Sequence, residues 1–369
     1  MTKKPHRTEP QKRLYSLDAL RGFDMFWITG GGTLAIAVSK LTGAEWLGQQ
    51  MEHVNWEGFH FEDLIFPLFM FISGVAITFS VKAKLEKNIP KHSLLRKAFM
   101  RMIILILLGI LYNGTFKNGF EHGRIASVLG QIGIGYFIAA IIVIYFSSFK
   151  SRLIWLTGIL AGIGIIQLII PVPGIGAGVL TPEGCINGYI DRLLLPGRLY
   201  GGTFDPEGIL CSISASGITL MGTIAGNILR NKKTTDWQKI SYIVIAGIGS
   251  VIIAIILSTF YPIIKSAWTS TFNLLAGGIS FLILALFYLI IDHWGFKSWA
   301  FYFRIIGMNS IFVYLFTRMV DAWDLSEFFV GWLIKPLGES GNIPGILAGL
   351  LAIWLLLYYM YKKNIFIRV

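Results

Sequence analysis

A histidine and two carboxylates stand where a polar stretch of the chain meets an apolar one. His53 precedes Asp63 by ten residues, and Glu62 lies directly before the aspartate. No side chain from Leu64 to Val81 is ionisable, and a charged carboxylate costs about 2.5–3.5 kcal/mol at the centre of a bilayer. A carboxylate beside a histidine orients the ring and stabilises the imidazolium, as in a general base. The spacing therefore indicates acid–base or nucleophilic chemistry at the start of a membrane helix.

The same two carboxylates also suit a structural role. Asp and Glu are favoured in the first turn of a helix, where free backbone N–H groups and the helix dipole favour negative charge. Glu62 and Asp63 fit that position, whereas His53 has no capping function there. Both interpretations of the carboxylates remain open from the sequence.

The composition predicts an all-α, polytopic membrane protein. Of the 369 residues, 54% are hydrophobic, and the mean hydropathy is +0.66. Soluble domains are typically about 45–50% apolar, and a helix needs about 20 apolar residues to cross a bilayer. We expect about ten spans, and a further apolar piece at 326–337 is too short to be one. The expected spans are 15–38, 60–81, 98–113, 126–147, 153–171, 208–229, 240–262, 269–291, 300–320 and 344–361.

The basic residues predict the orientation of these spans. With the N-terminus inside, 21 Lys and Arg residues fall in cytoplasmic segments and seven in outer loops, as the positive-inside rule describes. Both termini are then cytoplasmic, with a tail at residues 1–13 followed by a single transmembrane domain at 14–369. The formal net charge of +12 follows from this topology, so nucleic acid is not an expected partner.

The first expected span contains charged residues that a removable signal peptide would lack. Asp18, Arg21 and Asp24 interrupt it and no small-residue cleavage site follows, so we expect a retained helix. Asp18 and Arg21 are three residues apart and share a helix face, which favours an ion pair. Alternatively, Arg21 and the nearby Arg13 would bind phosphates, to which guanidinium groups donate paired hydrogen bonds.

Further polar residues lie at the edges of other spans. Asp205 and Glu207 end the longest outer loop, 172–207, and would bind a cationic amine or sugar hydroxyls. Equally, an Asp-Pro pair starts turns and a Glu suits the first turn of a helix. Asn309, in the ninth span, needs a hydrogen-bond partner, from a substrate or from a neighbouring helix. No metal-binding spacing is present, so we expect no metal.

Several motifs follow one another in the order found in a known family, and together they cover residues 13–369. The chain resembles the heparan-α-glucosaminide N-acetyltransferase family. Each motif is short, but their common order is specific. The motifs are SLDALRG, the glycine run Gly30–Gly32, His53 with NWEG, EDLIFPLFMFISG, RIASVLGQIGIGYF, GYIDRLLL, FDPEGIL, GMNSIFVYL and YKKNIFIRV.

The resemblance implies an enzyme that moves an acetyl group across a membrane. The donor would be cytosolic acetyl-CoA, and the acceptor would be the amine of a glucosamine-type sugar on the extracytoplasmic side. His53 matches the essential histidine of the family and would act as general base or acetyl carrier. Asp63 matches its partner at the same spacing.

The resemblance also extends to binding residues. Arg13 and Arg21 match the basic residues around the first helix, where acetyl-CoA would bind, and Asp205 and Glu207 match the acidic pair at the acceptor side. One departure concerns the glycine run. The lysosomal member carries an Asn beside it that helps to hold the acetyl group, whereas Ile28-Thr29 precedes the run here.

The expected partners are acetyl-CoA as cosubstrate, an amino sugar or glycan acceptor, and membrane lipid. The glycine-rich spans permit a homodimer. The expected location is the cytoplasmic membrane of a bacterium. Two rival hypotheses remain: the charged intramembrane residues would serve equally in an amino-sugar permease without acyl transfer, and a structural protein would have no use for His53 and Asp63.

Overall fold

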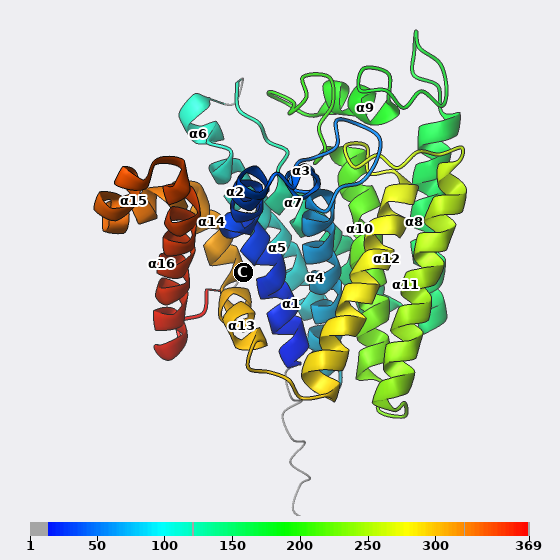
Figure 1. Cartoon of the computed structure of the whole chain (residues 1–369). Helices are drawn as coiled ribbons and strands as arrows, with labels where there is room; N and C mark the ends of the chain where they lie inside the picture. Colours follow the sequence, from blue (N-terminus) through cyan, green and yellow to red (C-terminus); the bar gives the residue numbers. More distant parts are fainter. Residues whose placement is uncertain (1–13, 120–121, 321, 368–369) are drawn as a thin grey trace, which may run out of the picture.

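The protein is a bundle of helices joined by loops (Figure 1). The computed structural model describes residues 14–119, 122–320 and 322–367. Arg13 lies outside these residues. The helices are α1 (Tyr15–Phe26), η1 (Trp27–Gly31), α2 (Gly32–Thr42), α3 (Glu45–Gln49), α4 (Glu62–Leu85), α5 (Lys91–Tyr112), α6 (Thr115–Asn118), α7 (Val128–Tyr145), α8 (Phe149–Ile169), α9 (Ile186–Leu194), α10 (Ile209–Arg230), α11 (Asp236–Ser258), α12 (Ser270–Phe287), η2 (Tyr288–His293), α13 (Ala300–Met308), α14 (Ser310–Met319), α15 (Ala322–Ile334), η3 (Lys335–Gly341) and α16 (Asn342–Lys362).

The prediction of an all-α polytopic membrane protein is confirmed. Within the described residues, seven helices are long and apolar enough to cross a membrane, and the pair α13 and α14 would make an eighth. That pair is bent by 78° at Asn309. The count is lower than the expected ten, because two of the expected spans differ from the others.

These two spans are the first and the third. The first is divided at η1, where Gly30 has a φ of +140°, a backbone conformation that only glycine adopts readily. The third lies within α5, whose amino-terminal half carries Arg96, Lys97 and Arg101. Charges in that half shorten the apolar part of the helix.

The core of the bundle depends on close helix crossings. On α4, a Cβ added at Gly74 would lie 1.9 Å from the carbonyl oxygen of Thr219 on α10, and one at Gly222 would meet Phe71 in the same way. Glycine lets two helix backbones approach this closely. α10 is therefore mostly buried, whereas α11 presents Ile252 and other large apolar side chains on its outer side.

Loops from distant parts of the sequence meet at one end of the bundle, the upper end in Figure 1, where α3 and α9 lie. A bridge joins Glu57 to Ile264, and the N–H of Gly58 donates to the carbonyl of Ile263 at 2.9 Å. The indole Nε1 of Trp56 donates to the carbonyl of Leu180 at 2.6 Å. The loop that carries His53 is thus held between the α11–α12 loop and the 172–207 segment.

Candidate active site

His53 and Asp63 are in direct contact at the upper end of α4. The ring Nδ1 of His53 lies 2.9 Å from Oδ1 of Asp63, whose side chain is fully buried, while the histidine side chain is 55% exposed. The other carboxylate oxygen accepts the backbone N–H of His60 at 3.0 Å. Asp63 therefore holds both the histidine ring and the backbone of the turn that precedes its helix. Because a carboxylate only accepts hydrogen bonds here, we assign the proton to Nδ1 and leave Nε2 as the basic nitrogen.

A third charged group, Lys265, completes this cluster. It comes from the loop between α11 and α12, and its Nζ lies 3.3 Å from Oδ1 of Asp63. The same Nζ is 3.1 Å from Nδ1 of His53 and 3.5 Å from Nε2. Burial lowers the pKa of Lys265, and the surrounding carboxylates oppose this shift. Sequence reasoning did not select Lys265, because in the sequence it is only one of the seven basic residues in the expected outer loops.

A cavity of about 180 Å³ opens beside the cluster, and we call it the His53 cavity. Its polar wall contains His53, Glu62, Glu207 and Lys265, and its deeper wall is largely apolar. Glu62 precedes Asp63 on α4, so the first turn of this helix places one carboxylate in the cavity and one behind the histidine. The apolar lining comes from Met25, Ile28, Ile65, Phe66, Phe69, Val128, Leu129, Ile132 and Ile311, with Ser310 and Tyr314.

A second cavity, also of about 180 Å³, adjoins the first, and we call it the Arg21 cavity. Phe69, Ser310 and Ile311 line both cavities. Its basic residues are Arg21 from α1 and Arg101 from α5. Two guanidinium groups therefore lie on the far side of the wall that separates the Arg21 cavity from the His53 cavity.

The two arginines are held differently. The Nη1 of Arg21 lies 3.4 Å from Oδ1 of Asp18, so the ion pair that the sequence favoured coexists with a position at the cavity. The guanidinium carbon of Arg101 lies 4.2 Å from the ring centre of Tyr136. Arg101 was not selected from the sequence, where it is one of four basic residues that lie in or beside the expected spans.

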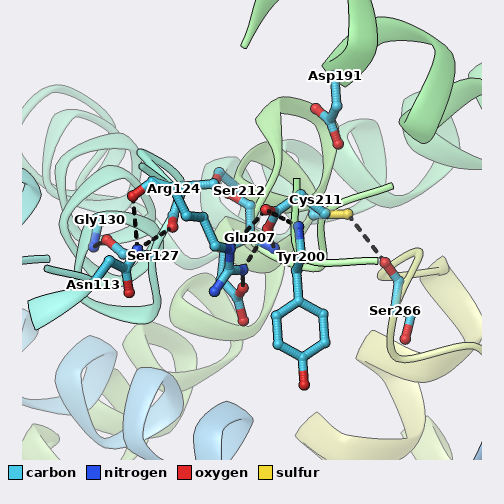
Figure 2. Close-up of polar contacts among 12 residues, drawn as sticks. Asn113, Arg124, Ser127, Gly130, Asp191, Tyr200, Glu207, Cys211, Ser212 and Ser266 are labelled. Carbon is cyan, nitrogen blue, oxygen red and sulfur yellow. Dashed lines mark hydrogen bonds and ion pairs between the residues drawn. The ribbon is translucent and has the colours of Figure 1, made fainter. Parts of the chain in front are cut away.

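Asp205 and Glu207 are both paired with Arg124 at the upper end of the bundle. The guanidinium donates from Nε to Oδ2 of Asp205 at 2.8 Å and from Nη2 to Oδ1 at 2.6 Å. Nη2 also contacts Glu207, and Figure 2 shows these two side chains meeting beside Tyr200. Arg124 begins one of the family motifs but was assigned no site role from the sequence, and a bridge to Gly197 brings it to this place.

The two acidic residues differ in what remains open to a ligand. Asp205 is buried and also accepts the backbone N–H groups of Tyr200 and Glu207, each at 3.0 Å. Of the pair, Glu207 lines the His53 cavity. Burial raises the pKa of Glu207, although the charge of Arg124 acts in the opposite direction.

Asn309 lies at the break between α13 and α14, and its amide contacts main chain. Its Nδ2 donates to the carbonyl of Ile365 at 3.1 Å, and its Oδ1 accepts the N–H of Ile367 at 2.9 Å. The side chain is buried, and Ile367 lines the Arg21 cavity. Asn309 thus contributes to that cavity through the segment it holds.

Comparisons with known proteins bear on this arrangement. The family profile described as "Acyltransferase domain" matches residues 14–362. Heparan-alpha-glucosaminide N-acetyltransferase of Mus musculus is 28% identical over an alignment 420 positions long, which covers 98% of this chain and 61% of the mouse protein. The Homo sapiens protein of the same name is 28% identical, with 97% and 60% covered. The chain therefore spans about three fifths of the length of these relatives.

Proposed function

This chain belongs to the acyltransferase-domain family, and on that premise we propose that it is a membrane acetyltransferase. The donor is acetyl-CoA and the acceptor is the amine of an amino sugar of the glucosamine type. The observation that carries the proposal is the His53–Asp63 pair, 2.9 Å apart, at the wall of a cavity that adjoins a second, basic cavity. The similarity to two proteins named as glucosaminide N-acetyltransferases supports the choice of acetyl donor and amino-sugar acceptor.

The donor enters from the end of the bundle where α1 begins, which we take as cytoplasmic. Arg21 and Arg101 receive its phosphates, because guanidinium groups donate paired, charge-assisted hydrogen bonds to phosphate oxygens. Arg13, which lies outside the described residues, is proposed as a further phosphate contact. The shared wall at Phe69, Ser310 and Ile311 then leads the thioester towards His53.

The acceptor enters from the opposite, extracytoplasmic end. Its ammonium group is drawn to Glu207 and Glu62, the two carboxylates in the wall of the His53 cavity. Asp205 supports this position by fixing Arg124 and the backbone of Glu207. Asn309 acts on the donor side by holding the wall of the Arg21 cavity.

His53 acts as the general base. Its Nε2 takes a proton from the attacking amine while Asp63 stabilises the imidazolium. Holding thioester and amine together in one cavity supplies a large part of the acceleration, since it removes the entropy cost of their encounter. An acetyl-histidine route uses the same two residues.

The test is product formation by the purified protein in detergent. Acetyl-CoA is incubated with a panel of free and glycosidically linked amino sugars, and acetylated products are identified by mass spectrometry. We expect acetylation of at least one glucosamine-type acceptor, with stoichiometric release of CoA thiol. Uptake of an amino sugar into proteoliposomes without any acetylated product would instead identify a permease.

A further inference from the structure

We propose that Lys265 is a catalytic residue that stabilises the oxyanion formed on the thioester carbonyl. This inference rests on the proposed acetyl transfer. Its basis is the position of Nζ, which lies 3.3 Å from Oδ1 of Asp63 and 3.1 Å from Nδ1 of His53, at the wall of the cavity where the acyl group would be transferred.

The charges in the His53 cavity single out this residue. Among the described residues that line the cavity, Lys265 is the one Lys or Arg, and it stands with Glu62 and Glu207. Acyl transfer places a negative charge on the carbonyl oxygen, and donors fixed beforehand at that point are the main means of stabilising it. The carboxylates repel such a charge, so the ammonium group must provide the attraction.

The ammonium group is held in advance of the reaction. The ion pair with Asp63, at 3.3 Å, holds the ammonium group in place, and its three N–H groups leave a donor for the substrate. The loop around it is tight: the N–H of Trp268 donates to the carbonyl of Lys265 at 2.9 Å, and that of Thr269 to Ile264 at 3.2 Å. Trp268 is buried with a φ of +46°, a costly conformation for a bulky residue that the surrounding packing must maintain.

The transfer step then has a defined role for each group. The bound ammonium group first releases one proton to solvent. The neutral amine nitrogen then attacks the carbonyl carbon and forms the C–N bond, while the carbonyl π electrons move to oxygen and Lys265 donates a hydrogen bond to that oxyanion. Nε2 of His53 takes one proton from the nitrogen. The C=O bond re-forms, the C–S bond breaks, and the departing thiolate receives the proton from His53 as CoA thiol. Lys265 keeps its proton throughout.

The first measurement compares Lys265→Met, Lys265→Arg and a control, Lys335→Met, which removes an exposed lysine paired with Glu327. Loss of one oxyanion donor typically lowers kcat about 100- to 1,000-fold. We expect a loss of that size in Lys265→Met with acetyl-CoA affinity, measured by equilibrium binding, within about threefold of wild type. We expect wild-type rates in Lys335→Met.

The second measurement is the pH dependence of kcat. It distinguishes a catalytic from a structural role of Lys265, and it tests the proposal even if Lys265→Met does not fold. The groups that face Lys265 are Asp63 and Glu62 on α4, Glu207 before α10, and His53. Loss of its proton removes the positive charge that stabilises the oxyanion, so wild-type kcat must fall as pH rises through the pKa of Lys265, which burial sets below the ordinary 10.5. Lys265→Arg, which stays protonated, must lose this alkaline fall.

The outcomes are distinguishable from failure of the proposed function. If the wild-type protein acetylates no amino sugar, both proposals fail. If it does, a folded Lys265→Met variant with kcat within about threefold of wild type overturns the role of Lys265 alone. A fall of kcat at alkaline pH that is the same in Lys265→Arg as in wild type also overturns the role of Lys265.

Discussion

Asn309 binds the backbone of Ile367, and this contact joins the break between α13 and α14 to the segment that follows α16. The Oδ1–N distance is 2.9 Å, and Nδ2 of the same amide donates to the carbonyl of Ile365. Figure 1 shows the chain turning back from the end of α16 towards α13. A polar side chain that the sequence placed in a membrane span thus uses both ends of its amide to fix one wall of the Arg21 cavity.

Replacing this amide should act on donor binding. In Asn309→Ala the segment 364–367 loses both hydrogen bonds, so the wall of the Arg21 cavity loosens and the KM for acetyl-CoA should rise about tenfold, with a smaller change for the acceptor. Asn309→Asp keeps an acceptor for Ile367 but loses the donor to Ile365, and should be intermediate. An acceptor KM that rises while the donor KM does not would assign Asn309 to the acceptor.

Removal of the proposed base should stop transfer without unfolding the protein. His53 lies in a half-exposed position, so His53→Ala loses little packing, while the loss of a general base lowers kcat about 100- to 10,000-fold. Asp63→Asn should lower kcat less than His53→Ala does, since the amide keeps the shape of the side chain and removes only its charge. The control is His92→Ala, an exposed histidine at the start of α5. Wild-type turnover by a folded His53→Ala sample would refute this assignment.

The two cavity arginines should govern the affinity for the donor. A charge-assisted hydrogen bond contributes about 1.5–3 kcal/mol, so Arg21→Gln or Arg101→Gln should weaken acetyl-CoA binding roughly tenfold or more. Dephospho-CoA and CoA, compared by isothermal titration, identify the phosphate concerned. Arg96→Gln, which changes an exposed arginine on the same helix as Arg101, should leave both affinities unchanged.

Arg124 should matter for stability. Arg124→Gln leaves the buried carboxylate of Asp205 without its cation, and breaking a buried pair in this way costs about 3–5 kcal/mol. The midpoint of thermal unfolding should fall by several degrees. Arg198→Gln, which changes an exposed arginine in the segment that carries Asp205, is the control. An unchanged midpoint in Arg124→Gln would mean that water replaces the guanidinium.

A pH dependence of stability should come from Asp191, outside the membrane-spanning helices. Burial raises the pKa of this carboxyl to about 6 from an ordinary 3.8. Its Oδ1 accepts the N–H of Ile209 at 2.9 Å, and its Oδ2 has no partner among the described residues. The folded state therefore binds the proton more tightly than the unfolded state, and the stabilisation present below about pH 4 is lost as pH rises through about 6.

The free energy of unfolding should fall by roughly 3 kcal/mol over this pH range, because the pKa of Asp191 differs by about two between the folded and unfolded states. In Asp191→Asn this loss should disappear, because the amide oxygen still accepts from Ile209 and carries no charge. The measurement is the midpoint of thermal unfolding at pH 4.5, 6 and 7.5, with exposed Asp324→Asn as control. Parallel curves for wild type and Asp191→Asn would contradict the prediction.

The sequence by itself determined the class of the protein. Apolar runs of about 20 residues require helices in a membrane, because a lipid-exposed backbone must satisfy its hydrogen bonds internally. His53 and Asp63 were selected for the same kind of reason, since a histidine and a carboxylate at the mouth of an apolar helix are costly without a partner. Their contact in the structure, at 2.9 Å, follows from that logic. The order of the motifs also identified the family.

The tertiary structure decided which other residues join this pair. Lys265 is more than 200 positions from His53 along the chain, and Arg124 is more than 80 from Asp205. These contacts depend on isolated bridges between loops, Glu57 with Ile264 and Arg124 with Gly197, which have no periodic pattern in the sequence. Local spacing predicts what shares one helix face, whereas a contact between loops depends on how whole helices pack. For that reason the sequence could indicate Asp205 as a ligand residue, but only the packing showed that Arg124 holds its carboxylate.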